Sequence, residues 1–160
     1  MSHPSLGAPP LDETAGFPAE AERLMGDRGR VGRRALEVCL DRDPAMRDRL
    51  GDEGIARLLR DTEIFVERLA RAIAADDAYL TREFAEWVAP VYRRRRVAMD
   101  DLIALSNGIR QVAAGSLTPA ARSVADKAID EAIVVFRRHR RLAGDARRRN
   151  RILEAIYKGA

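Results

Sequence analysis

Apolar residues recur at helical spacing along most of the chain. The longest such stretch runs over five turns, and its stripe consists of Ile55, Leu58, Leu59, Thr62, Phe65, Val66, Leu69 and Ile73. Positions three and four residues apart share one face of an α-helix, so this stretch predicts a long amphipathic helix. No stretch alternates between apolar and polar residues over a length that is typical of a strand. The pattern therefore predicts an all-α fold of about seven helices.

Capping residues and helix breakers divide the pattern into segments. Asp43-Pro44 and Thr118-Pro119 each place a capping side chain before a proline, which is typical of a helix start. Asp100 or Asp101 is expected to cap another helix, and Pro90 is expected to kink or end the one before it. The predicted helices span residues 18–26, 30–40, 44–51, 55 to the Asp76-Asp77 pair, 77–90, 101 onward, 119–143 and a last segment after Gly144.

Length and composition bound the possible classes of protein. The chain has 160 residues, which fits one domain, and we expect a flexible arm over 1–17 and a single helical domain over 18–160. Aromatic residues make up only 5%, so aliphatic residues and alanine must form the core. The single Cys39 excludes an internal disulfide. Without a long apolar run or a secretory signal, we expect a soluble cytoplasmic protein that does not enter a membrane.

Charge is distributed unevenly. Residues 1–90 have a net charge of −5 and residues 91–160 a net charge of +9. The basic surface is predicted to comprise Arg93, Arg94, Arg95, Arg96, Arg137, Arg138, Arg141, Arg147 and Arg148. Such clusters are usually a solvated face, but they can also dock an acidic partner or neutralise phosphates. Because arginine dominates lysine throughout, a GC-rich genome would explain the bias equally well.

The middle of the chain resembles a known family. The resemblance covers residues 55–117 and depends on the stretches 65–70, 73–77, 84–87 and 94–97, followed by the helix from Asp101. Together they resemble the globin-like sensory domains at the N-terminus of stressosome RsbR-type proteins. The resemblance implies a compact globin-like bundle that forms homodimers through helices and serves in sensing or scaffolding. No output domain follows before Ala160, so signalling would pass through a separate protein partner.

Cofactor binding and catalysis find little support in the residues. A haem-binding globin would need a proximal histidine near residues 84–100, and none lies there. His139 falls on the apolar stripe of its helix, where a backbone carbonyl near the helix C-terminus would satisfy it; metal binding and a titrating switch are the alternatives. Cys39 lies on another apolar stripe and is expected to be a buried hydrophobe. We expect no cofactor, no metal and no enzymatic activity.

Two further sets of residues are candidates for binding. Phe65, Phe84, Trp87 and Tyr92 are either ordinary core or the lining of a small apolar pocket, with His139 as a further candidate member. The helix over 119–143 has Ile133 and Val134 outside its main stripe, which suggests a dimer interface. Ile152 and Ile156 are a second candidate for that interface.

The sequence therefore predicts a non-catalytic sensory or scaffolding protein that acts by homodimerisation and partner association. The alternative is an arginine-rich protein that binds nucleic acid or another polyanion.

Overall fold

The computed structural model describes residues 12–143, and within them the chain forms helices and connections without a strand. The elements are α1 (Ala19–Gly26), α2 (Arg28–Arg42), α3 (Ala45–Ala75), α4 (Tyr79–Arg94), α5 (Met99–Ala113), the 3₁₀ turn η1 (Ala114–Ser116) and α6 (Pro119–Ala143). The all-α prediction is confirmed. The described part of the chain has six α-helices rather than about seven, because the segments predicted over 44–51 and 55–75 join as α3. The segment predicted after Gly144 lies outside the described residues.

The predicted starts of two helices agree with the structure to within one residue, since α3 begins at Ala45 and α6 at Pro119. Gly51 bends α3 with a φ of 66°, a conformation that glycine adopts without steric cost. The backbone N–H of Ala121 donates to Thr118 Oγ1 at 3.4 Å, which confirms the predicted start of α6. The expectation that Asp100 or Asp101 caps α5 was wrong. The helix begins at Met99 and includes both aspartates in its first turn.

Pro90 was expected to kink or end its helix; an end at Pro90 is wrong, since α4 continues to Arg94. Proline removes the hydrogen bond to the carbonyl four residues earlier, and its ring crowds that carbonyl. Residues on both sides of it, Val88, Ala89 and Tyr92, are buried against the rest of the bundle and hold the helix together.

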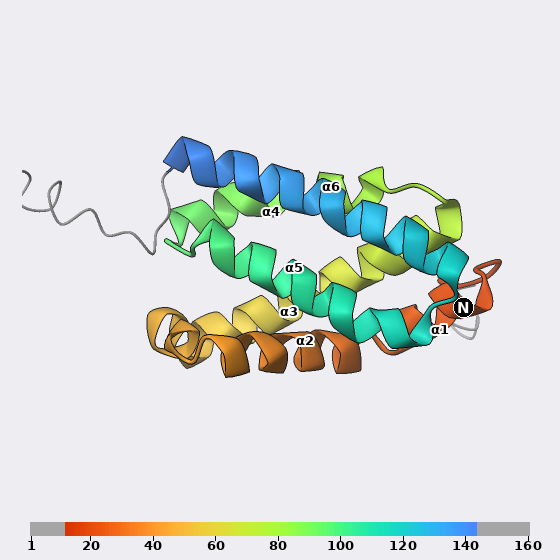
Figure 1. Ribbon diagram of the computed structural model, residues 1–160, viewed down its shortest axis with the longest axis horizontal. Coiled ribbons are helices and arrows are strands. Elements are labelled where there is room, and N and C mark those ends of the chain that lie inside the picture. The colour runs from red at the N-terminus through yellow and green to blue at the C-terminus, as the bar shows by residue number, and fades with distance from the viewer. Residues whose placement is uncertain (1–11, 144–160) are drawn as a thin grey trace, which may run out of the picture.

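The helices form a bundle whose long axes run roughly along one direction (Figure 1). α2 and α3 form an antiparallel hairpin, with α1 packed against α3. α4 and α6 lie parallel to each other, and α5 runs in the opposite direction, packed against α6 on one side and α2 on the other. No helix within residues 12–143 is long and apolar enough to cross a membrane.

Helix α6 packs against three other helices, α4, α5 and α3. Its buried face consists largely of small residues, and Ala128 and Ala132 are 0% exposed. Small side chains let helices approach closely, so main-chain atoms come within reach of neighbouring helices. Thr81 on α4, for example, donates its hydroxyl to the Ala128 carbonyl of α6.

A second close approach joins α2 to α5 at Gly108. A Cβ atom added to this glycine would lie 3.0 Å from the carbonyl oxygen of Ala35 and 3.3 Å from Cys39 Sγ. The first of these neighbours is backbone, which cannot move away without shifting α2. The packing of α2 against α5 therefore depends on the absence of a side chain at this position.

We predict that Gly108→Ala lowers the free energy of unfolding by about 1–3 kcal/mol through overpacking. This loss exceeds the gain of about 1 kcal/mol that alanine normally brings to a helix interior. Urea unfolding followed by circular dichroism measures the change. Gly29→Ala is the control, because its Cβ meets only the flexible Glu63 side chain at 3.6 Å. Equal stability of the two variants would contradict the predicted steric conflict.

Candidate functional site

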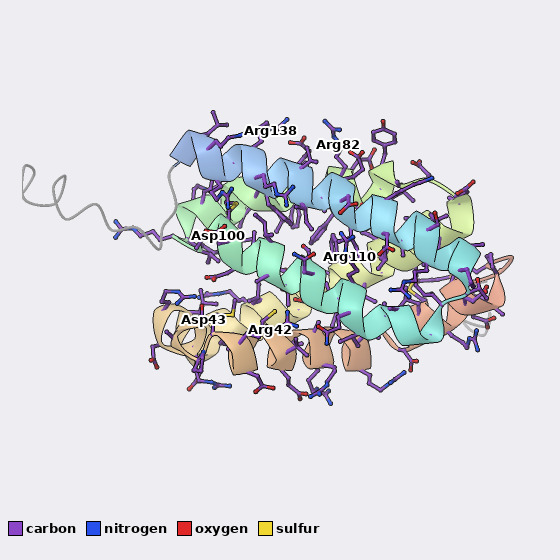
Figure 2. All side chains as sticks on the ribbon, viewed as in Figure 1. Arg42, Asp43, Arg82, Asp100, Arg110 and Arg138 are labelled. Atoms are coloured by element: carbon purple, nitrogen blue, oxygen red, sulfur yellow. The ribbon has the colours of Figure 1, made fainter. Side chains whose placement is uncertain are left out.

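The arginine clusters of α4 and α6 lie at the same end of the bundle. α4 and α6 both end there and α5 begins there, as the neighbouring positions of Arg138 and Asp100 show (Figure 2). The positive charge therefore lies at two helix C-termini, where the helix dipole favours cations. We call this region the arginine end; within residues 12–143 it consists of Arg93–Arg96, Arg137, Arg138, Arg140 and Arg141.

The backbone of the arginine end is held by the termination of α4. The N–H of Arg96 donates to the Arg93 carbonyl at 3.0 Å, and the N–H of Val97 donates to the Tyr92 carbonyl at 3.0 Å. These two bonds form a Schellman motif, in which one residue adopts the left-handed conformation. That residue is Arg96, with a φ of 59°, where glycine is the usual choice. Four consecutive arginines are thus fixed on an ordered turn.

Two arginines of this end take part in ion pairs. Arg138 bonds to Glu86, and Arg140 Nη1 lies 2.7 Å from Asp100 Oδ1. The other members are solvent-exposed and have no ion-pair partner among the described residues: Arg93, Arg94, Arg95, Arg96, Arg137 and Arg141. Arg147 and Arg148, also predicted for the basic surface, lie outside the described residues. The structure therefore brings the described members of the predicted surface together and leaves most of their charge uncompensated.

Asp101 provides an ion pair that the sequence did not reveal. Its side chain is 1% exposed and accepts a hydrogen bond from Arg49 Nη2 at 2.9 Å; Arg49 Nη2 also lies 2.7 Å from Asp43 Oδ2. These bonds connect the α2–α3 turn to the first turn of α5. From the sequence, Asp101 was explained as a helix cap. Arg49 lies 52 residues away in the chain, so no local pattern indicates the ion pair.

His139 is buried on α6 next to the arginine end. Its residue is 9% exposed, and its Nδ1 atom has no hydrogen-bond partner within residues 12–143. The expected backbone carbonyl therefore does not bond to this nitrogen among the described residues. Burial lowers the pKa of His139 below its ordinary value, and Arg93 and Arg138 lower it further against the opposing effect of Glu86.

A small cavity of about 30 Å³ lies between α3, α4, α5 and α6. Three of the predicted pocket residues, Phe65, Phe84 and Tyr92, line it, whereas Trp87 and His139 do not. The volume is close to that of one or two water molecules and far below the roughly 300 Å³ at which ligand pockets begin. The cavity in its present form is thus a packing gap, too small for a macrocycle such as haem.

One polar pair contributes to the lining of this cavity. The Tyr92 hydroxyl donates to Asp61 Oδ2 and so connects α4 to α3. Burial and this carboxylate together raise the pKa of Tyr92 above its ordinary value. Tyr92 therefore remains a neutral hydrogen-bond donor.

Trp87 belongs neither to the core nor to the lining of the cavity, the two alternatives predicted for it. Its side chain is 63% exposed, and its ring contacts Phe84 with centroids 6.1 Å apart. α4 packs against α3 and α6, and the face that it buries against them includes Ala85 and Val88. Trp87 lies outside this buried face. Leu142 on α6 is also exposed, at 69%.

The predicted dimer interface on α6 is only partly available. Ile133 is 3% exposed and belongs to the core, because α6 packs against helices on two sides and buries a wide face. Val134 is 51% exposed, as expected, but its neighbours on that face are charged. Ile152 and Ile156 lie outside the described residues. Within residues 12–143, α6 therefore offers one isolated apolar side chain rather than a patch.

Cys39 is 3% exposed on α2, which confirms its prediction as a buried hydrophobe. Burial raises its pKa to about 11, so the thiolate is a minor species at neutral pH. No group of three or more His, Cys, Asp or Glu side chains in the described region is arranged to hold a metal ion.

Comparisons with protein-family models, with curated proteins and with solved structures find no match for this chain.

We predict that the free energy of unfolding falls as the pH decreases from 7 to 5. The lowered pKa of His139 means that the unfolded chain binds a proton before the folded chain does. The stabilisation is therefore complete above the ordinary histidine pKa and is lost as the pH falls towards the folded value. Urea unfolding at a series of pH values should show a weaker dependence for His139→Gln. A His139 variant with unchanged pH dependence would contradict the prediction.

We also predict that Arg96→Gly raises the free energy of unfolding by about 0.5–1 kcal/mol, because it relieves the left-handed conformation of a residue with a side chain. Arg95→Gly removes the same charge at a φ of −85° and should instead lower stability, since glycine adds freedom only to the unfolded chain. Thermal and urea unfolding compare the two variants. If both change stability in the same direction, charge and not backbone conformation controls this turn.

Proposed function

We propose that the protein is a non-catalytic sensory or scaffolding protein that acts by homodimerisation and by association with a separate protein partner in signalling. The arginine end carries this proposal. It combines uncompensated positive charge with a backbone fixed by the Schellman motif, so the guanidinium groups are presented on an ordered surface. Ordered charge favours fast and selective docking of an acidic partner.

The conformation of Arg96 supports a role for this surface beyond solubility. A side chain in the left-handed conformation costs about 1–2 kcal/mol, and glycine would remove that cost. Strained positions of this kind occur preferentially at functional sites. An arginine at this position is therefore better explained by its charge than by its fit to the turn.

The globin-like character of the bundle is part of the same proposal. It derives from the resemblance of residues 55–117 to the sensory domains of RsbR-type proteins. A bundle with a small apolar cavity between four helices is compatible with sensing through helix displacement, because filling or emptying such a cavity shifts closely packed helices.

The second candidate function is binding of nucleic acid or another polyanion, and it is favoured by the same exposed arginines. Each phosphate that an arginine neutralises makes binding more sensitive to salt. The two candidate functions therefore differ in how strongly the protein binds duplex DNA of random sequence and in how steeply that binding depends on salt.

A comparison of two variants with equal charge distinguishes the candidates. One replaces Arg93, Arg95, Arg137 and Arg141 by Gln; the control replaces Arg23, Arg33, Arg60 and Arg68, which are exposed on other faces. For a protein that docks a partner, we predict that both variants and the wild type bind random duplex DNA equally weakly, with a shallow salt dependence. Light scattering should show a mass near twice the 17.8 kDa chain for all three.

Tight DNA binding that only the first variant loses, with a salt slope reduced by about 0.9 for each lost phosphate contact, would establish polyanion binding instead. A wild type that stays monomeric at high micromolar concentration would contradict the homodimer.

A further inference from the structure

Helix α4 exposes a stripe on the side that faces away from the core. Glu83, Trp87, Pro90 and Arg94 follow one another at spacings of four, three and four residues, which places them on one face of the helix. Glu83, Trp87 and Arg94 are exposed, and Pro90 is partly exposed. The opposite face of α4 is filled by Thr81, Ala85 and Ala89, which are 0% exposed. The stripe is thus a surface that the described bundle does not use.

The centre of the stripe is the single tryptophan of the chain. One side of the Trp87 ring packs on Phe84, and Phe84 packs on Phe65 with ring centroids 5.7 Å apart. The indole is thereby supported from the core while 63% of its surface remains exposed. A rigid exposed indole is the residue type that most often anchors a protein interface. Val91, partly exposed beside it, extends the apolar area.

The charges at the two ends of the stripe are opposite. Glu83 lies near the start of α4 and Arg94 is its last residue, and neither has an ion-pair partner among residues 12–143. Eleven residues separate them, about three helical turns or roughly 16 Å along the axis. An acidic end, an apolar centre and a basic end make a stripe that complements itself when a second copy is turned around.

We propose that α4 pairs antiparallel with α4 of a second copy of this chain. The two-fold axis passes between residues 88 and 89. It brings Glu83 to Arg94 of the partner subunit and packs Trp87 on Pro90 and Val91 of the partner subunit. This inference rests on the proposed homodimerisation and assigns a surface to it. That surface replaces the interface predicted on α6, where Ile133 is buried in the core.

The charge pattern favours a second copy of this chain as the partner of the stripe, and it favours the antiparallel direction over the parallel one. A parallel pair of α4 helices would place Glu83 against Glu83 and Arg94 against Arg94, and like charges in contact oppose association. The antiparallel pair makes two opposite-charge contacts and also sets the two helix dipoles against each other favourably. Exposed ion pairs add little affinity, so the indole supplies the attraction and the charges supply the register.

Two single charge reversals test the pairing directly. Glu83→Arg alone and Arg94→Glu alone each create two like-charge contacts per dimer, and we expect about a tenfold or greater loss of dimer affinity. The double variant restores both contacts in exchanged form and should recover most of that loss. An equimolar mixture of the two single variants should form a heterodimer, because every contact between unlike copies is then complementary. Asp41→Arg on α2 is the control of equal charge change and should dimerise as the wild type.

Sedimentation and the emission of Trp87 provide two independent readouts over a micromolar concentration series. As the wild type dimerises, the emission should shift to shorter wavelength in proportion to the dimer fraction, because the indole leaves water. Circular dichroism of each variant verifies that the helices are intact.

The outcomes separate this inference from the proposed function. A dimeric wild type whose single variants remain dimeric, or whose emission does not shift, overturns the α4 interface and leaves homodimerisation standing. A monomeric wild type overturns both. Within that outcome, emission already at short wavelength would show that another part of the same chain covers Trp87. Failure of the mixed single variants to pair, while each alone is monomeric, would overturn the antiparallel register, because Glu83 and Arg94 would then not face each other across the interface.

Discussion

The close packing of small side chains between α6 and its neighbours limits where larger side chains can lie between α3, α4, α5 and α6. Ala128 and Ala132 let α4 and α5 approach α6 from two sides, and Gly108 does the same between α5 and α2. Once helices are this close, only a narrow set of positions can hold large residues. Phe65, Phe84 and Phe136 fill the space that remains between four helices, and a cavity of about 30 Å³ marks where they do not fill it completely.

This constraint explains which predictions succeeded. Helix positions depend on local signals such as Asp43-Pro44, Thr118-Pro119 and Gly51, and these were readable from the sequence. Which face of a helix is buried depends on its neighbours. Ile133 lies beside the main stripe of α6 but is buried, because a helix packed on two sides buries a wide face. Trp87 is as apolar as its neighbours, but the core direction of α4 leaves it outside.

In the candidate site, too, the local features could be predicted from the sequence and the contacts between helices could not. Arginine clusters at residues 93–96 and 137–141 were evident in the sequence, but their proximity follows from the parallel arrangement of α4 and α6, which no local pattern encodes. The pairing of Asp101 with Arg49 is likewise a long-range contact. Burial of an acidic group requires such a partner, so this ion pair fixes the start of α5 against the α2–α3 turn. The start of α5, which lies at the arginine end, is thus held in place by this ion pair.

The two proposed surfaces have a geometric consequence when they are considered together. An antiparallel pair of α4 helices points the two C-termini of α4 in opposite directions, and each C-terminus carries one arginine end. Arg94 would serve the pairing, while the other exposed arginines of each end stay outside it. A dimer built in this way presents two positively charged ends that face away from each other. The two Arg94 residues lie about 16 Å apart along the helix pair, because each lies beside Glu83 of the partner subunit. The separation of the two positively charged ends thus follows from the direction and register of one helix pair rather than from any chemistry within the bundle.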